Sequence, residues 1–167
     1  MGISWDKVMK KNEKTNVMRV LEQNKIPYNS YTYADTDAIS GVEVATVLNQ
    51  NPNQVFKTLV TVGSSKIYYV FMIPVHQELD LKKAAKAVGE KSISMIKSKE
   101  LLPLTGYIHG GCSPIGMKKQ FKTIIQESAA NFETIIFSAG KIGYQVEVPI
   151  EALKKVVRYE LKDVIIE

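Results

Sequence analysis

Residues 55–73 read VFKTLVTVGSSKIYYVFMI and are the clearest structural signal in the chain. β-Branched and aromatic residues dominate both ends of this stretch, as is typical of β-strands. Gly63, Ser64 and Ser65 separate the two ends. Because small turn residues between two such runs favour a tight reversal, the stretch predicts a β-hairpin with strands over residues 55–62 and 66–73.

Patterns on both sides of the hairpin predict helices and strands in irregular order. Ser40 opens a capping-box pattern for a helix over residues 40–48, and Asp80 and Gly89 bound another over residues 81–88. Further helices are expected over residues 15–23, 98–102 and 150–156, and further strands over residues 28–33, 106–109, 122–126, 134–137, 144–148 and 164–166. Since no regular crossover helices separate the strands, this order predicts an α+β domain with a mixed, curved sheet flanked by helices.

The composition indicates a single domain over residues 1–167, with residues 1–15 as a frayed lead-in. One cysteine excludes an intramolecular disulfide, and the charged start of the chain lacks the apolar core of a signal peptide. Because the apolar runs are too short to span a bilayer, we expect a cytoplasmic protein with no membrane partner. A net charge of +5 and a pI near 9.1 are compatible with a polyanionic partner.

Lys57 is the one charged residue in the strand over residues 55–62. Strand alternation places it on one face with Leu59 and Thr61, while Phe56 and Thr58 lie on the other. One interpretation is that the long stem carries the ammonium out to water. The other is that the ammonium binds a phosphate or carboxylate in a cleft, with a shifted pKa if it is desolvated.

Residues 110–119 read GGCSPIGMKK, a glycine and proline loop that leads into paired lysines. The glycines admit a close ligand, and Pro114 restricts Ser113 as well as itself. The loop therefore predicts either a tight turn or a preformed site whose N–H groups bind an anion or a carbonyl oxygen. The lysines at 118, 119 and 122 are either phosphate contacts or an ordinary solvated face.

Metal and nucleotide motifs are absent from the sequence. It contains no CxxC, HExxH, Walker or dinucleotide-binding pattern, and His76 and His109 show no ligand spacing with Cys112. We therefore expect neither a metal nor a cofactor. A catalytic pair of Cys112 and His109 is disfavoured, because residues three apart along a strand and loop rarely meet and no orienting acid is evident. Cys112 is better interpreted as a small residue that fills the loop.

Several motifs together resemble the YbaK/EbsC family, the free-standing branch of the prolyl-tRNA synthetase editing domains. The similar segments, in chain order, are FKTLV (56–60), MIPV (72–75), LDLKKAAK (79–86), LTGY (104–107), GGCSPIGMKK (110–119) and FSAGKIG (137–143). The resemblance extends from about Asn16 onward and implies that family's α+β domain with a barrel-like sheet. It also implies a deacylase that removes a wrongly attached amino acid from tRNA, above all from Cys-tRNA(Pro), with Cys-tRNA(Cys) as a further substrate.

The resemblance also assigns roles to residues. It implies that Lys57 contacts the terminal ribose-phosphate or the aminoacyl group, and that Ser138 forms a hydrogen bond to the substrate. The loop borders the aminoacyl carbonyl and limits side-chain size through Gly110, Gly111, Cys112, Ser113 and Pro114, while Tyr33 and Thr58 line the pocket. The implied tRNA contacts are Lys118, Lys119 and Lys122.

The implied partners are the tRNA acceptor end with its amino acid and prolyl-tRNA synthetase. Family members work without a protein nucleophile, so either the thiol of the substrate or a water molecule attacks the ester. Ser40 departs from the pattern, because better-known members often carry an aromatic residue there. The alternatives are a non-catalytic module that binds aminoacyl-tRNA or a synthetase, and a regulator of another process.

Overall fold

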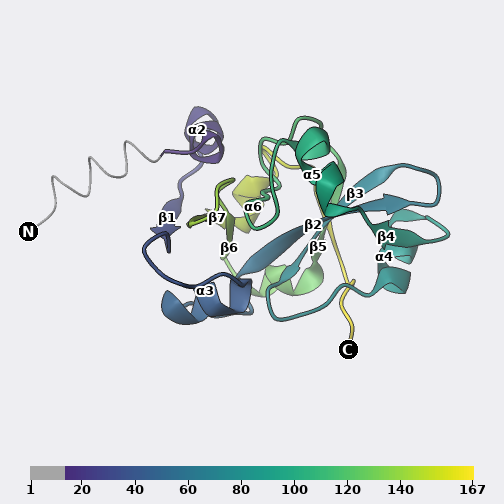
Figure 1. Ribbon diagram of the computed structural model, residues 1–167, viewed down its shortest axis with the longest axis horizontal. Helices are drawn as coiled ribbons and strands as arrows, with labels where there is room; N and C mark the ends of the chain where they lie inside the picture. The colour runs from purple at the N-terminus through teal and green to yellow at the C-terminus, as the bar shows by residue number, and fades with distance from the viewer. Residues whose placement is uncertain (1–13) are drawn as a thin grey trace, which may run out of the picture.

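A computed structural model describes residues 14–167, so the expected lead-in over residues 1–15 lies almost wholly outside the described residues. The helices are α2 (Asn16–Gln23), α3 (Gly41–Val47), α4 (Leu81–Val88), α5 (Ser98–Thr105) and α6 (Ile150–Leu153), with a 3-10 turn η1 (Glu127–Asn131). The strands are β1 (Asn29–Thr32), β2 (Phe56–Gly63), β3 (Tyr68–Pro74), β4 (Ile93–Met95), β5 (Lys122–Gln126), β6 (Thr134–Ser138), β7 (Tyr144–Pro149) and β8 (Tyr159–Lys162). Figure 1 shows α2 and α5 on one side of the strands and α3 and α4 on the other.

The strands form two sheets, in the orders β1-β7-β6 and β4-β2-β3-β5-β8. The β2–β3 hairpin is antiparallel, whereas β5 pairs in parallel with both β3 and β8. The α+β class and the mixed pairing are therefore confirmed. The barrel-like sheet is not, because the strands divide between two sheets that do not close on one another.

A single parallel bridge between Val55 and Ile136 joins the two sheets. Ile136 N–H donates to Gln54 O at 3.0 Å, and Val75 N–H donates to Val55 O at 2.9 Å. Beyond the bridge, β2 and β6 form no further ladder, and β4 pairs only with the last part of β2, from Thr61 onward. Among the described strands, residues 56–60 of β2 therefore have no strand partner on the side of β2 that faces away from β3.

The capping signals in the sequence are confirmed. The Ser40 hydroxyl accepts the N–H of Glu43, and the Glu43 carboxylate accepts the N–H of Ser40, which completes the capping box of α3. The Asp80 carboxylate accepts the N–H groups of Lys82 and Lys83 at the start of α4. Gly89 ends α4 with a φ of 74°, a left-handed conformation that glycine adopts without a Cβ clash.

Two predicted strands are wrong. Residues 106–109 are not extended, because Gly106 ends α5 in the left-handed conformation and Tyr107 N–H donates to the Thr105 hydroxyl. Residues 164–166 contribute only an isolated bridge between Ile165 and Leu79, while the strand that pairs with β5 is β8. The helix predicted over residues 150–156 ends at Leu153 and continues as turns.

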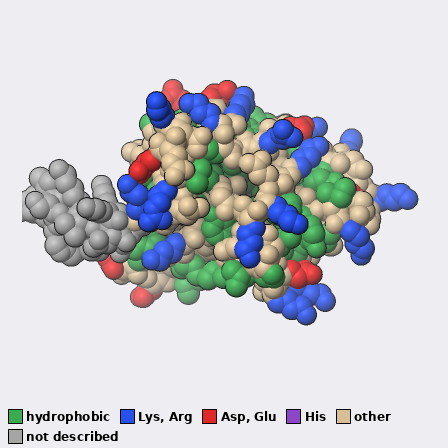
Figure 2. Space-filling view, turned by 90° about the horizontal axis from the view of Figure 1, so that it is seen from above, with side chains coloured by type: hydrophobic (Ala, Val, Ile, Leu, Met, Phe, Trp, Pro, Cys, Tyr) green, Lys and Arg blue, Asp and Glu red, His purple; other side chains and the backbone are tan. Residues whose placement is uncertain are grey.

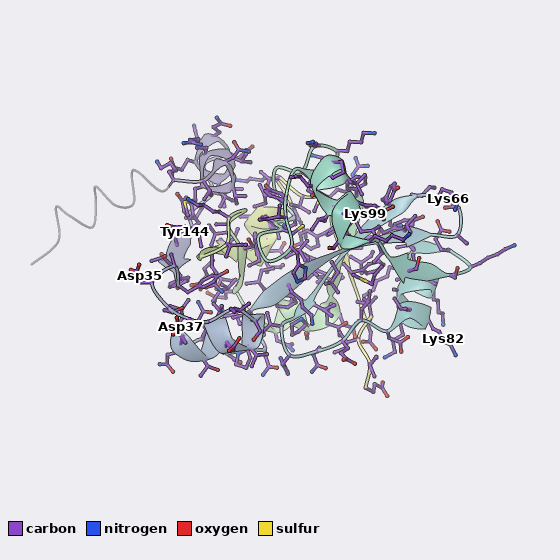
Figure 3. The ribbon with its side chains drawn as sticks, viewed as in Figure 1. Asp35, Asp37, Lys66, Lys82, Lys99 and Tyr144 are labelled. Atoms are coloured by element: carbon purple, nitrogen blue, oxygen red, sulfur yellow. The ribbon has the colours of Figure 1, made fainter. Side chains whose placement is uncertain are left out.

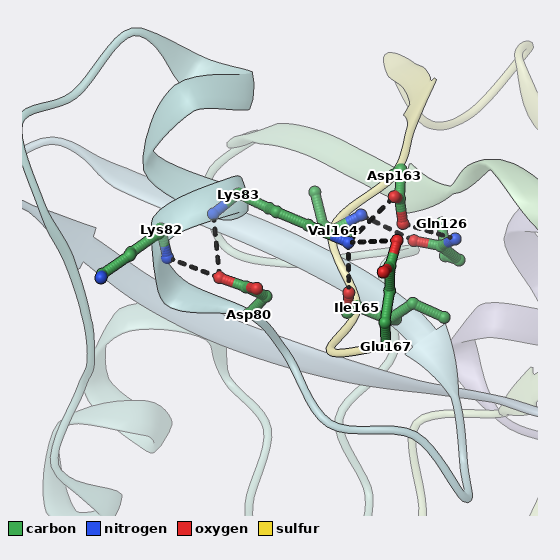
Figure 4. Close-up of polar contacts among 8 residues, drawn as sticks. All are labelled: Asp80, Lys82, Lys83, Gln126, Asp163, Val164, Ile165 and Glu167. Atoms are coloured by element: carbon green, nitrogen blue, oxygen red, sulfur yellow. Dashed lines mark hydrogen bonds and ion pairs between the residues drawn. The ribbon is translucent and has the colours of Figure 1, made fainter.

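Polar contacts close the C-terminal end of the described chain over β5 and α4 (Figure 4). The Gln126 side chain accepts the N–H of Val164 at 2.7 Å and donates to the Asp163 carboxylate at 3.2 Å. Lys83 Nζ donates to the same carboxylate at 3.0 Å and to Ile165 O at 2.9 Å. Gln126 is 4% exposed, so its amide is the buried centre of this C-terminal clasp.

We expect Gln126→Met to lower the free energy of unfolding by about 1–3 kcal/mol, because it keeps the side-chain volume but leaves a buried N–H without an acceptor. Urea denaturation measures the change. Lys83→Met is the control and should cost less, because the Lys83 ammonium is partly exposed and its ion pair is screened by water. A larger loss from Lys83→Met than from Gln126→Met would contradict this assignment.

Candidate functional site

Lys57 and Ser138 occupy equivalent places on β2 and β6. Each lies two residues beyond the bridged pair Val55 and Ile136, and the bridge is parallel, so both strands continue in the same direction. Side chains two residues apart on a strand share a face. Val55 and Ile136 pack in one apolar cluster with Ala45 of α3. Lys57 and Ser138 therefore emerge on the α3 side, just beyond the bridge that joins the two sheets.

Lys57 carries an unpaired charge. Its side chain is half-buried, and its ammonium forms no hydrogen bond or ion pair with any other described residue. Burial lowers the pKa of Lys57, and the carboxylate of Glu78 opposes this shift. The predicted alternation is confirmed, because Leu59 packs against the α4 cluster whereas Phe56 belongs to the core beneath the other sheet. A half-buried cation without a partner is available to an anionic or carbonyl ligand.

Ser138, the last residue of β6, and the backbone of Tyr33 both lie at the β6–β7 turn. The Ser138 hydroxyl accepts the N–H of Gly140 at 3.1 Å, and its own hydrogen has no acceptor among the described residues. The backbone N–H of Tyr33 donates to Gly143 O at 2.8 Å, which fixes Tyr33 beside the β6–β7 turn. The Tyr33 hydroxyl has no partner within residues 14–167. The structure therefore brings Ser138 and Tyr33 to the same turn.

The glycine loop lies between the β6–β7 turn and β2. A Cβ on Gly111 would lie 3.1 Å from the backbone nitrogen of Ile142, so this close approach to the β6–β7 turn favours glycine. Cys112 belongs to the same apolar cluster as Val60 of β2. Gly110 has a φ of 88° and faces solvent. The loop thus contacts the turn that carries Ser138 on one side and packs near β2 on the other.

The available N–H groups of the loop come from the residues that follow the glycines. Gly111 N–H donates to Ile108 O at 3.0 Å and is therefore occupied. Cys112 and Ser113 are 8% and 0% exposed, and their backbone N–H groups have no acceptor in the described part of the chain. Buried N–H groups are rarely left unpaired. The N–H groups of Cys112 and Ser113 are therefore the candidates for binding a developing oxyanion. The glycine pattern in the sequence did not indicate which N–H groups of the loop are free.

The side chains of the loop are structural. The Ser113 hydroxyl accepts the N–H of Ile115 at 3.3 Å and stays inside the loop. Burial raises the pKa of the Cys112 thiol to about 12, so almost no thiolate is present near neutral pH. This agrees with Cys112 as a small filling residue and argues against a nucleophile. The buried Pro114 forms part of the wall of a separate groove behind the loop.

Two buried polar atoms lack partners near these elements. The Thr58 hydroxyl has none, and it lies on the face of β2 opposite to Lys57. The side-chain amide oxygen Oε1 of Gln50 has none either, although Gln50 Nε2 donates to Gln145 Oε1 at 2.7 Å. Gln145 is the register partner of Ser138, so this amide pair adjoins the site. Neither glutamine was predicted from the sequence. The one available signal was Gln145 itself, a polar residue within the otherwise apolar strand over residues 144–148.

The three predicted tRNA contacts differ in their surroundings. Lys118 Nζ donates to Pro103 O at 3.5 Å, and Lys122 lies 3.6 Å from the Glu160 carboxylate. Lys119 is exposed and has no ion pair among the described residues. The Ser40 hydroxyl is used in the α3 cap. Within residues 14–167, no cluster of three or more His, Cys, Asp or Glu residues could hold a metal, and no helix is long and apolar enough to cross a membrane.

Comparisons with known proteins give a consistent result. A family model described as an aminoacyl-tRNA editing domain matches residues 36–156. A relative from Enterococcus faecalis, named "Putative Cys-tRNA(Pro)/Cys-tRNA(Cys) deacylase EbsC", is 51% identical over 145 residues, which cover 86% of this chain and 88% of the relative.

Two solved structures share the fold. One is described as "a putative trans-editing enzyme for prolyl tRNA synthetase", with a TM-score of 0.78, 22% identity, and coverage of 90% of this chain and 95% of that one. The other is from work on epitope grafting onto scaffold proteins, with a TM-score of 0.79, 21% identity and the same coverage.

We expect the thiol of Cys112 to react slowly with a disulfide reagent such as DTNB at pH 8 in the folded protein, because its raised pKa and burial withhold the thiolate. After denaturation the single cysteine should react fully and quickly. Absorbance at the wavelength of the released thiolate measures both rates. A native rate close to the denatured one would show an accessible, activated thiol and reopen the nucleophile interpretation.

Proposed function

Since the chain belongs to the aminoacyl-tRNA editing domain family, we propose that it is a trans-editing deacylase that cleaves cysteine from Cys-tRNA(Pro), and also from Cys-tRNA(Cys). The name of the Enterococcus relative and its 51% identity support this choice of substrates. The observation that carries the proposal is the unpaired, half-buried ammonium of Lys57 on the same face as Ser138.

Cleavage of an aminoacyl ester requires little chemical activation by the site. An aminoacyl ester is already reactive, so the enzyme must hold the 3′-terminal adenosine, orient the carbonyl and stabilise its oxyanion. In our proposal Lys57 binds the terminal ribose-phosphate or the aminoacyl group. The N–H groups of Cys112 and Ser113 and the hydroxyl of Ser138 donate to the carbonyl oxygen. Tyr33 lines the pocket, and Thr58 contributes from the other face of β2, where the loop packs.

The attacking group comes from outside the protein in this proposal, because the Cys112 thiol is buried and protonated. In one route the substrate's own thiol attacks its ester carbonyl. A C–S bond forms, the C–O bond breaks and the thiol proton passes to the ribose oxygen, which releases a cyclic thioester. In the other route water attacks and free cysteine leaves. The hydroxyl of serine is similar in size to the thiol of cysteine but is a weaker nucleophile. Cleavage of a serine ester as fast as the cysteine ester would therefore support attack by water.

The proposal includes narrow recognition of the amino acid and broad tolerance of the tRNA body. The loop at residues 110–114 is held on both sides, against the β6–β7 turn and near β2, so it is a rigid wall for the amino acid. A domain of this size reaches the acceptor end and leaves tRNA identity to another protein, for which prolyl-tRNA synthetase is the candidate. Because charged tRNA is made and used in the cytoplasm, we place the activity there.

Loss of labelled cysteine from Cys-tRNA(Pro) tests the proposal, with Ala-tRNA(Pro) and Pro-tRNA(Pro) measured alongside. We expect wild-type protein to cleave the cysteine ester fastest and Lys57→Ala to reduce kcat/KM by about 10²–10³, the size of effect seen when one oxyanion donor is removed. Lys66→Ala is the control, since Lys66 lies at the tip of the β2–β3 hairpin, far from β1 and β7 (Figure 3).

The outcomes separate the alternatives. Full activity in Lys57→Ala would exclude the proposed role of the ammonium. If no ester is cleaved while tRNA still binds, the protein is a non-catalytic binding module. Equal rates on the three esters would rule out selection by the loop.

The pH dependence of cleavage tests the charge on Lys57. Only the ammonium form binds an oxyanion, and burial lowers its pKa, so activity should fall at a lower pH than an ordinary lysine would give. Glu78→Gln removes the carboxylate that raises this pKa, so the alkaline limb of the pH–rate profile should move to still lower pH. The shift should shrink in high salt, because Glu78 is exposed. Glu127→Gln is the control, since Glu127 does not act on the Lys57 pKa, and an equal shift there would contradict the assignment.

A further inference from the structure

A groove of about 290 Å³ lies behind the glycine loop. It is bounded by α2, by residues 114–123 and by residues 155–158, so three distant parts of the chain contribute to it. We call it the basic groove, because its wall includes Lys119, Lys155 and Arg158. The wall contains no Asp or Glu among the described residues. Figure 2, seen from the side of α2 and α5, shows Lys and Arg side chains spread over this face.

The three cations of the basic groove are not neutralised. Lys119, Lys155 and Arg158 are exposed, and none of their side chains has an ion pair or hydrogen bond with another described residue. Neighbouring lysines are engaged, since Lys154 pairs with Glu151 at 3.0 Å and Lys122 lies 3.6 Å from Glu160. The groove thus concentrates positive charge that the protein itself does not use.

The groove also supplies uncharged contacts. Asn24 and Gln120 provide amide groups, and Val156 and Phe121 provide an apolar wall. Cations beside amides and apolar surface suit a chain of phosphates with sugars and bases between them. A simple anion would need only the charges.

The location connects the groove to the candidate site. Pro114, the last residue of the predicted carbonyl-facing loop, lines the basic groove, as does Gly116. One face of the loop therefore contacts the Ser138 turn through Gly111, while its continuation forms the wall of the groove. A polymer that presents its end to the site lies within reach of the groove.

We infer that the basic groove binds the phosphate backbone of the RNA strand whose 3′ end enters the site, with Lys119, Lys155 and Arg158 as the phosphate contacts. This inference rests on the proposed function for the identity of the RNA. Lys155 and Arg158 are new contacts, since they follow α6 and had no local motif to mark them. Because the contacts are to phosphates, they add affinity for any RNA with an accessible acceptor end and carry no base specificity.

The first test measures binding without cleavage. An uncharged RNA hairpin that ends in a single-stranded 3′ extension is labelled, and its affinity for the full chain is measured by fluorescence anisotropy at several salt concentrations. We expect the triple variant Lys119→Glu, Lys155→Glu, Arg158→Glu to bind about tenfold more weakly or worse at low salt. The slope of log K against log salt should become shallower by about 2–3, since each phosphate contact contributes about 0.7–0.9.

A matched variant controls for net charge. Lys82→Glu, Lys86→Glu, Lys91→Glu makes the same change in charge on and just after α4, and Figure 3 shows Lys82 at the opposite end of the molecule from α2. Its affinity and salt slope should stay close to wild type. If the two triple variants weaken binding equally, net charge explains the effect and the inference is overturned.

A second substrate separates this inference from the proposed function. The cysteine ester of adenosine alone has no RNA to occupy the groove, so the groove variant should cleave it at the wild-type rate while its KM for Cys-tRNA rises. An unchanged KM for Cys-tRNA would overturn the inference. If wild-type protein cleaves neither ester but the groove variant still loses RNA binding, the proposed function fails and the groove stands as an RNA site.

Discussion

The parallel bridge between Val55 and Ile136 is the constraint on which the site depends. It joins the two sheets in parallel, which places Lys57 and Ser138 at equivalent positions on the same side of β2 and β6. Gln54 reinforces the joint from the neighbouring position, because its side chain donates to Thr134 O at 3.0 Å. The glycine loop packs near β2 through the apolar cluster that Cys112 shares with Val60.

The site is assembled from polar groups that the fold leaves unpaired. A buried donor or acceptor without a partner lowers the stability of the fold by about 1–3 kcal/mol. Each of the unpaired groups therefore destabilises the protein: the Thr58 hydroxyl, Gln50 Oε1 and the free N–H groups of the loop. The rest of the domain offsets that cost through well-capped helices, buried sheets and the C-terminal clasp. Such groups bind a polar ligand without first breaking an internal hydrogen bond. The arrangement is therefore suited to positioning a reactive ester and needs no activated nucleophile of its own.

Local signals in the sequence predicted much of this architecture. The hairpin, the caps at Ser40 and Asp80, and the alternation at Lys57 depend on residues close together in the chain, and all three are confirmed. The division into two sheets and the pairing of β5 with β8 depend on contacts between distant segments, which no local pattern encodes. The same limit applies to the site. The glycine loop and Ser138 were visible as motifs, whereas the Gln50–Gln145 pair exists only after α3 has packed on the three-stranded sheet.

The pairing of β8 with β5 affects how the protein is made. The five-stranded sheet ends with residues 159–162, and Ile165 then pairs with Leu79, more than eighty residues earlier in the chain. Synthesis adds about 5–20 residues per second, and domains generally fold from their N-terminal parts first. Here β2, β3 and β5 leave the ribosome before β8 does, so the edge of β5 stays uncovered until β8 has been synthesised and paired. The nascent chain therefore exposes the edge of a largely buried strand for seconds, whereas the finished protein has covered that edge.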